Sequence, residues 1–262
     1  MRYFLRLAYN GERFHGWQSQ PNAVSVQQTI EEALTTVMRL PISIVGAGRT
    51  DTGVHARRMY AHFDTPEPVA DKRRLLLALN RLAGKDIAFY DLIEVADNAH
   101  ARFDAVERTY KYFVTFEKSP FLYPFAWHSP SPLDAVRMNE AASLLLQTKD
   151  FTSFAKLHSD VKTNNCDVTE AVWTPLSECS GNGCGLSVPK EGLVFTITAD
   201  RFLRNMVRAV VGTLVDVGRG KISIEGFQDI IREKDRCSAG TSMPAAGLFL
   251  WNVTYPYIDD VT

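Results

Sequence analysis

The order of its predicted strands and helices constrains the fold of this 262-residue chain most strongly. Hydrophobic periodicities follow one another as β-α-β-β-α-β over residues 3–95. The same order returns over residues 108–255 when one short predicted helix at 224–233 is set aside. Six elements in this order form a split β-α-β, or ferredoxin-like, unit. The sequence therefore predicts an α+β fold of two ferredoxin-like units side by side, forming an extended and mostly antiparallel sheet.

The boundary between the two units is predicted near Ala99–Asp104, which gives domains 1–102 and 103–262. A sheet that carries helices on one face leaves its other face open. Two open faces side by side would make a long concave groove. The polar, glycine-rich segments 157–165 and 177–192 are predicted to be exposed loops.

Local signals place the ends of several elements. Ser25 and Gln28 have capping-box spacing at the start of a helix, and Ser131-Pro132 resembles a cap followed by a first-turn proline. A strand is predicted over 42–45, and a helix is predicted over 201–217.

The composition is that of an ordinary folded protein, with 45% hydrophobic and 23% charged residues and a net charge of -1. No apolar run reaches the roughly 18 residues of a membrane helix. The segment after Met1 lacks the pattern of a signal peptide, so we expect a cytoplasmic protein. Cys179 and Cys184 could flank a metal-binding turn, but Cys166 and Cys237 do not form the matching pair that a zinc site needs.

One glycine-rich segment, residues 46–56, joins two strands of the first unit and carries Arg49 and Asp51. Residues two apart on extended backbone point the same way. A neighbouring guanidinium favours the ionised form of a carboxyl group, so Asp51 would be a nucleophile or an electrostatic stabiliser rather than a general acid. A structural ion pair at a glycine turn would produce the same pattern.

The triplet Asp51-Thr52-Gly53 also matches the core of aspartic proteases. Those enzymes need two carboxyl groups that share one proton, and a homodimer could supply the second. Arg49 would ionise both groups, and the usual apolar flank is absent, so the pattern argues against a protease.

Basic residues gather in both halves. On a helix beginning at Arg201, the side chains of Arg201, Arg204 and Arg208 would fall on one side. Arg57 and Arg58 follow the glycine-rich segment. Such patches are typical either of polyanion binding or of an ordinary solvated surface.

The strand that begins at Arg108 places Tyr110 and Tyr112 on one face. Aromatic and cationic side chains on an open sheet face can stack on bases, although alternating aromatics in strands are also typical of a core.

The segment Gly46–Ala56, with Arg-Thr-Asp-Thr-Gly-Val-His-Ala, resembles the tRNA pseudouridine synthase A family. Further similar motifs follow in order along nearly the whole chain. They are Phe14–Gln18, Val26-Gln27, Ala101–Ala105, Arg108–Tyr112, Phe202–Arg208 and Pro244–Leu248. The chain departs from the family at Leu82–Asp86, which lacks the usual Leu-Pro, and at Met243, where alanine is usual.

The resemblance implies an isomerase that converts uridine to pseudouridine at positions 38 to 40 of the tRNA anticodon stem-loop. It implies a homodimer, a central RNA-binding cleft, and neither cofactor nor metal. Asp51 would be the nucleophile, attacking either the sugar carbon C1′ or the uracil C6. Tyr110 would pack on the uracil, Arg208 would pair with Asp51, and Arg49 would help to extrude the base. Contacts to RNA are expected from four further residues, Arg57, Arg58, Arg201 and Arg204. An RNA-binding module without chemistry remains an alternative from the residues alone.

Overall fold

The computed structural model describes residues 1–156, 162–179 and 191–258, which form two compact units. The first unit is Met1–Glu107 together with the closing segment from Phe249, and the second is Arg108–Leu248. The division into domains 1–102 and 103–262 stays a prediction. Most of the two expected loops, and Cys184, lie outside the described residues.

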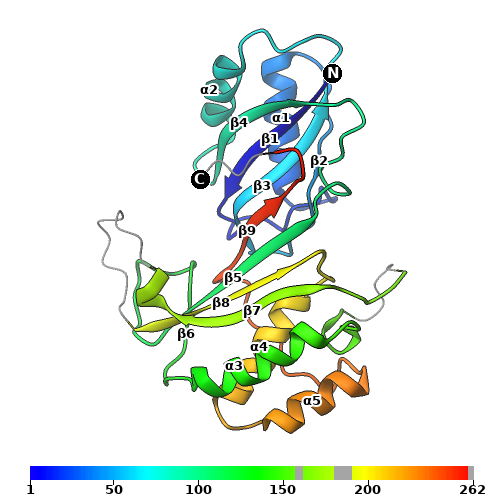
Figure 1. Ribbon diagram of the computed structural model, residues 1–262. Coiled ribbons are helices and arrows are strands. Elements are labelled where there is room, and N and C mark those ends of the chain that lie inside the picture. Colours follow the sequence, from blue (N-terminus) through cyan, green and yellow to red (C-terminus); the bar gives the residue numbers. More distant parts are fainter. Residues whose placement is uncertain (157–161, 180–190, 259–262) are drawn as a thin grey trace. The chain divides into compact units, whose positions relative to one another are not determined.

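The first unit contains five strands and two helices among the described residues (Figure 1). In chain order they are β1 (Arg2–Tyr9), α1 (Val26–Met38), β2 (Val45–Gly46), β3 (His55–Asp64), α2 (Lys72–Leu82), β4 (Ile87–Val95) and β9 (Leu248–Thr254), the last of which begins at the final residue of the second unit.

The sheet of the first unit has the order β4-β1-β3, with antiparallel pairing throughout. The far edge of β3 is shared by two strands. β2 pairs antiparallel with its C-terminal half through Val45 and His62, and β9 pairs parallel with its first residues through Phe249 and His55. The last strand of the chain therefore extends the first sheet next to the segment that carries the glycine-rich motif.

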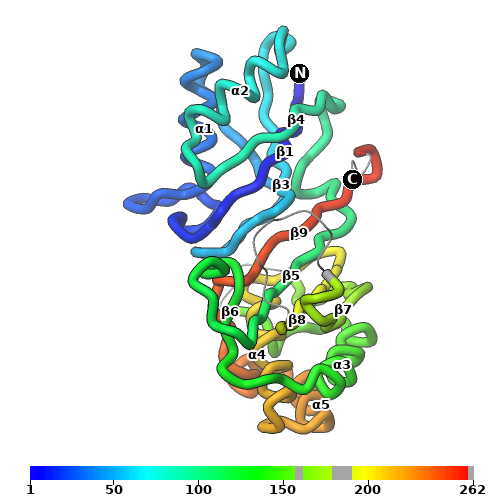
Figure 2. The backbone as a smooth tube through the Cα atoms, turned by 90° about the vertical axis from the view of Figure 1, so that its left-hand side faces the viewer, coloured from blue at the N-terminus to red at the C-terminus, as the bar shows by residue number. Residues whose placement is uncertain are grey.

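Helices α1 and α2 lie side by side on one face of that sheet (Figure 2). Ser25 caps α1, because its side chain accepts a hydrogen bond from the Gln28 N–H, as the capping-box spacing predicts. Asp71 caps α2 in the same way through the Arg74 N–H. The buried residues of α1 recur at helical spacing, so one face of the helix is apolar; they are Val26, Ile30, Ala33 and Leu34.

The second unit contains four strands, three α-helices and three short 3-10 turns among its described residues. In chain order they are β5 (Glu107–Thr115), β6 (Trp127–His128), α3 (Ala135–Ser143), η1 (Leu144–Gln147), η2 (Thr152–Phe154), β7 (Val168–Pro175), η3 (Leu176–Cys179), β8 (Gly192–Ala199), α4 (Met206–Gly218) and α5 (Ile224–Glu233).

The sheet of the second unit has the order β5-β8-β7, and both pairings are antiparallel. The short β6 adds to β5 in parallel through Trp127 and Val114. Helices α3, α4 and α5 gather on one side of this sheet (Figure 1). The architecture is therefore α+β with mostly antiparallel sheets, as predicted. The prediction of two ferredoxin-like units is not confirmed, because β9 belongs almost wholly to the first unit.

Helix α4 forms the centre of the second unit. Ten of its thirteen residues are buried, so it packs on nearly all sides rather than along one stripe. It begins only at Met206, after Asn205 in left-handed backbone. The predicted start at Arg201 is therefore wrong, because residues 201–205 form a separate connection between β8 and α4.

Two other predicted element ends also differ. The strand expected over 42–45 is the two-residue β2 at Val45–Gly46, although Ile42 and Ile44 are buried as a strand would bury them. Asp134 rather than Ser131 caps α3, because its carboxylate accepts the Arg137 N–H. Asp and Ser have similar cap preferences, so composition alone could not choose between them.

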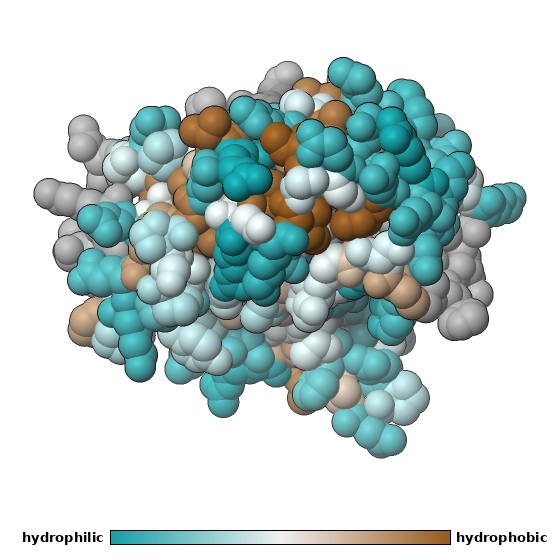
Figure 3. Space-filling model, turned by 90° about the horizontal axis from the view of Figure 1, so that it is seen from below, coloured by the Kyte–Doolittle hydropathy of each residue, from teal (hydrophilic) through white to brown (hydrophobic). Residues whose placement is uncertain are grey.

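None of the described helices combines the length and the apolar character that a membrane span needs. Seen from below, the molecule presents mostly hydrophilic side chains with hydrophobic ones clustered between them (Figure 3). Apolar atoms are common on folded surfaces, so this cluster alone assigns no partner.

A buried histidine ties the segment after β4 to the first sheet. His62 is 5% exposed, and its Nδ1 accepts the Ala101 N–H at 3.1 Å. Burial lowers the pKa of His62 from 6.5 to about 4, with further lowering by the charges of Arg2 and His100. Asp64 and Asp104 act in the opposite direction but are outweighed. His62 is thus a neutral hydrogen-bond acceptor at neutral pH.

This environment predicts an acid-sensitive fold. Below pH 6.5 the unfolded chain protonates His62 while the folded chain does not, so the free energy of unfolding should fall between pH 6.5 and about 4. A shift of this size corresponds to at most about 3 kcal/mol. Chemical unfolding of wild type and His62→Asn across this range checks it. Equal pH slopes in the two proteins would contradict the assignment.

Candidate active site

The glycine-rich motif forms the loop between β2 and β3, residues 47–54. Asp51 is half-buried near its middle, Arg49 is exposed, and Thr50 between them is 8% exposed. Asp51 is thus partly exposed, next to a residue that is packed into the core. That Arg49 and Asp51 point the same way stays a prediction.

A tight turn follows Asp51. Its carbonyl oxygen accepts the Val54 N–H at 3.1 Å, which closes a four-residue turn. Gly53 has φ of 78°, the left-handed value that the third position of a type II turn requires. This glycine is needed because a side chain at positive φ is strained.

The segment before α1 holds the other side of the loop. The Trp17 N–H donates to the Thr50 carbonyl at 3.1 Å, and the Gly53 N–H donates to the Phe14 carbonyl at 3.3 Å. Gly16 has φ of 90°, and a Cβ at this position would lie 2.6 Å from the Thr50 oxygen. The motif at Phe14–Gln18 thus supports the loop that carries Asp51.

A buried side-chain hydrogen bond lies under the same loop. The Tyr9 hydroxyl and Thr50 Oγ1 are 2.8 Å apart, and the Tyr9 and Trp17 rings are 6.1 Å apart. Sequence reasoning singled out neither Tyr9 nor Thr50 for a role. The available signal was their position, because Tyr9 ends a buried strand and Thr50 directly precedes Asp51.

The end of the loop is fixed by His55, the first residue of β3. Its Nδ1 accepts the Gly11 N–H at 3.1 Å, and its ring stacks on Phe249 at 4.7 Å. The ring is fully buried, so His55 has a structural role in the core next to the loop.

Two basic residues follow on β3. The Arg57 guanidinium is exposed and lies 4.7 Å from the Trp251 ring centre, a cation–π geometry. Arg58 is half-buried and donates to the Asn252 side-chain oxygen at 3.2 Å. Both belong to the first unit with Arg49 and Asp51.

Tyr110 and Tyr112 have different environments in the second unit. Tyr110 is half-buried, and its ring meets Phe202 edge to face at 5.0 Å. Tyr112 is fully buried and its hydroxyl donates to the Pro244 carbonyl at 3.1 Å. Burial raises the pKa of Tyr112, which the positive charge of Arg208 partly offsets. Tyr112 is therefore a core residue and not a stacking platform, while Tyr110 keeps an accessible part.

Arg208 is half-buried on α4, and its Nε donates to the Met243 carbonyl at 2.6 Å. The Met243 N–H returns a bond to the Arg208 carbonyl at 3.0 Å, which joins α4 to the motif that begins at Pro244. Arg201 and Arg204 precede α4, so the common helical face predicted for the three arginines is wrong. The Arg204 carbonyl accepts the Lys156 N–H, and Arg204 itself is exposed.

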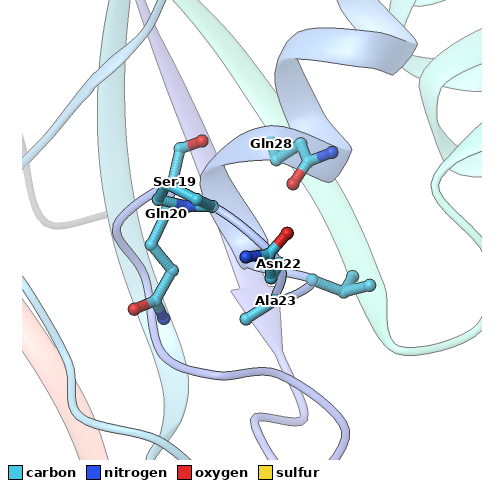
Figure 4. Close-up of a pocket in the computed structure, with 7 residues that line it drawn as sticks. Ser19, Gln20, Asn22, Ala23 and Gln28 are labelled. Atoms are coloured by element: carbon cyan, nitrogen blue, oxygen red, sulfur yellow. The ribbon is translucent and has the colours of Figure 1, made fainter.

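Each of the two units contains a hollow among its described residues. One, of about 670 Å³, lies in the connection leading into α1, as Figure 4 shows. Its lining has no ionisable side chain, so it could supply hydrogen bonds but no base to activate the Ser19 hydroxyl. It consists of Ser19, Gln20, Pro21, Asn22, Ala23, Val24 and Gln28. The other, of about 600 Å³, is mostly apolar and includes Tyr123, Trp127 and Pro244. The described lining of neither hollow includes Asp51.

Across residues 1–156, 162–179 and 191–258, no group of three or more His, Cys, Asp or Glu side chains could hold a metal ion. Cys166 is buried with its Sγ 3.9 Å from the Met206 sulfur, and burial raises its pKa to about 12, so it is an inert core thiol.

The candidate residues therefore fall into two sets, one in each unit. The first unit holds Arg49, Asp51, Arg57 and Arg58. The second holds Tyr110, Arg201, Arg204 and Arg208. Their combined action on one substrate stays a prediction.

Comparison with known proteins extends the motif resemblance to the whole chain. A family described as tRNA pseudouridine synthase matches residues 141–256. The tRNA pseudouridine synthase A of Parabacteroides distasonis is 56% identical over 257 residues, covering 97% of this chain and 96% of that protein. The enzyme of the same name from Bacillus subtilis is 39% identical over 259 residues, covering 97% and 99%. A chain so similar over nearly its full length, with Asp51 on a loop held from both sides, belongs to the tRNA pseudouridine synthase A family.

Proposed function

We propose that this protein converts uridine to pseudouridine in the anticodon stem-loop of tRNA, at positions 38 to 40. The observation that carries the proposal is the packed loop that presents Asp51, in a chain similar to tRNA pseudouridine synthases along nearly its full length. An RNA-binding module would not need a half-buried carboxylate on a loop fixed by hydrogen bonds at Thr50 and Gly53.

The reaction breaks the bond between the uracil nitrogen and the sugar, turns the base and rejoins it through C5. C5 loses its proton to solvent and N1 takes up a proton, so the product is an isomer of the substrate. Any bond that the nucleophile forms to the substrate is broken again before the product leaves. Asp51 is the nucleophile, and it attacks either C1′ of the sugar or C6 of the uracil. No redox step occurs, so the proposed chemistry needs no redox cofactor.

The other residues bind and orient the uridine. Tyr110 packs on the uracil, as its half-buried ring beside Phe202 allows. Arg208 pairs with Asp51, and Arg49 helps to extrude the base. Extrusion costs a few kcal/mol of lost stacking, which contacts to phosphates can offset.

The proposal also covers the architecture, the oligomeric state and the location of the protein. Two ferredoxin-like units form a central RNA-binding cleft, the protein acts as a homodimer, and it works in the cytoplasm. Phosphate contacts come from Arg57, Arg58, Arg201 and Arg204. Mass measurement of the native protein in solution tests the homodimer; a monomer at micromolar concentration would overturn that part.

The activity is tested with tRNA that lacks pseudouridine and carries tritium at uracil C5. Rejoining the base through C5 releases the label as water, and sequencing of the product locates the modified position. We expect release from the anticodon stem-loop. Absence of release by the wild-type protein would overturn the proposed function, and cleavage of peptides at acidic pH would favour the protease alternative.

Arg204 provides a test of the phosphate contacts. Arg204→Gln should weaken tRNA binding and reduce the slope of log affinity against log salt by about 1, because one fewer counterion is displaced. Arg232→Gln is the control, since Arg232 is also exposed, pairs with Asp229 on α5 and is not among the proposed phosphate contacts. Titration of tRNA at several salt concentrations measures both slopes, and equal slopes would contradict the assignment.

A further inference from the structure

We propose that Tyr9 is a positioning residue for Asp51, acting through its buried hydrogen bond to Thr50. The two oxygens are 2.8 Å apart, and both side chains are almost completely buried, at 4% and 8% exposure. The inference rests on the proposed function, because it concerns how the nucleophile is held.

The backbone on both sides of Asp51 is fixed by hydrogen bonds. Thr50 accepts from the Trp17 N–H, Asp51 accepts from the Val54 N–H, and Gly53 donates to the Phe14 carbonyl. These bonds fix the path of the chain. None of these three bonds involves the Thr50 side chain.

The Tyr9 hydroxyl holds the Thr50 side chain itself. It engages the side chain of Thr50 from the end of β1, a strand paired on both sides. Because Asp51 directly follows Thr50, holding the Thr50 side chain also limits movement of the backbone that carries the Asp51 side chain. A small displacement of a reacting group lowers the rate far more than it lowers binding, because binding uses many other contacts.

The chain offers a matched control on the same strand. Tyr3 is also fully buried on β1, and its hydroxyl accepts the Val69 N–H at 3.0 Å. Tyr3→Phe and Tyr9→Phe each remove one buried hydroxyl and leave the ring in place. The two variants differ in the segment that loses a hydrogen bond. Tyr3→Phe affects the segment before α2, and Tyr9→Phe affects the loop that carries Asp51.

The experiment compares steady-state tritium release, tRNA binding and thermal unfolding for wild type, Tyr3→Phe, Tyr9→Phe, Thr50→Val, Thr50→Ser and the double variant Tyr9→Phe/Thr50→Val. We expect Tyr9→Phe and Thr50→Val to lower kcat by about 10- to 100-fold with KM changed by less than about twofold. Thr50→Ser keeps the hydroxyl and should retain most of kcat. The double variant should be no slower than either single variant, because both remove the same interaction.

Each outcome decides for or against the proposal. A kcat of Tyr9→Phe close to wild type, an equal loss in Tyr3→Phe, or additive losses in the double variant would overturn it. A loss confined to melting temperature would likewise show a purely structural role. Failure of the proposed function itself looks different, because the wild-type protein would then release no label.

Discussion

Replacing Asp51 by asparagine should abolish tritium release from C5-labelled tRNA while tRNA binding persists. The amide has almost the same shape as the carboxylate, so the turn closed by the Val54 N–H stays intact. An amide nitrogen or oxygen cannot replace the carboxylate as a nucleophile at neutral pH. Loss of the attacking group in enzymes with covalent intermediates lowers kcat by about 10⁴-fold or more.

The measurement is single-turnover tritium release at saturating enzyme, which separates chemistry from binding. Asp97→Asn is the control, since the Asp97 side chain is 84% exposed and pairs only loosely with the N-terminal amine at 3.7 Å. A second readout is pseudouridine in tRNA from cells that lack the gene and carry each variant. Undiminished release by Asp51→Asn, or full restoration of pseudouridine in those cells, would refute the role of Asp51. If Asp51→Asn restored tRNA maturation without any release by wild type, the RNA-binding module would be favoured.

Local signals in the sequence predicted much of the first unit. The order of strands and helices and the Ser25 cap of α1 both depend on neighbours a few residues away. The sequence also identified the Asp51 loop, because three glycines and an Arg-x-Asp pair are unusual together. Such features are local, and periodicity and turn chemistry report them directly.

Strand pairing, the start of α4 and the burial of individual side chains could not be predicted from such local signals. β9 has an ordinary strand pattern, and only the folded chain shows that it pairs with β3. The late start of α4 reflects Asn205 in left-handed backbone, which helical periodicity does not register. Tyr112 looks like Tyr110 in the sequence but is buried against Pro244 from a distant segment. Contacts between distant segments therefore decided the cases of β9 and Tyr112, and a local backbone conformation decided that of α4.

Gly16 packs closely against the loop that carries Asp51, so we expect its replacement by alanine to have a large effect on stability and activity. A side chain at φ of 90° costs about 1–2 kcal/mol from the backbone alone. A Cβ there would also lie 2.6 Å from the Thr50 oxygen and 3.3 Å from the Asp51 carbonyl carbon, both rigid backbone atoms. Gly16→Ala must therefore displace the loop or unfold its support.

We expect Gly16→Ala to lower the melting temperature and to reduce kcat by at least about 100-fold, because a displacement near 1 Å has that effect on a reacting group. Gly48→Ala is the matched control in the Asp51 loop itself. A Cβ on Gly48 would meet no atom within 4 Å, so its stability should change by less than about 0.5 kcal/mol. Thermal unfolding and single-turnover release measure both variants. A loss of kcat and melting temperature in Gly16→Ala alone is the result that we expect. Equal values in the two alanine variants would show that the close contact between Gly16 and Thr50 does not hold Asp51 in place.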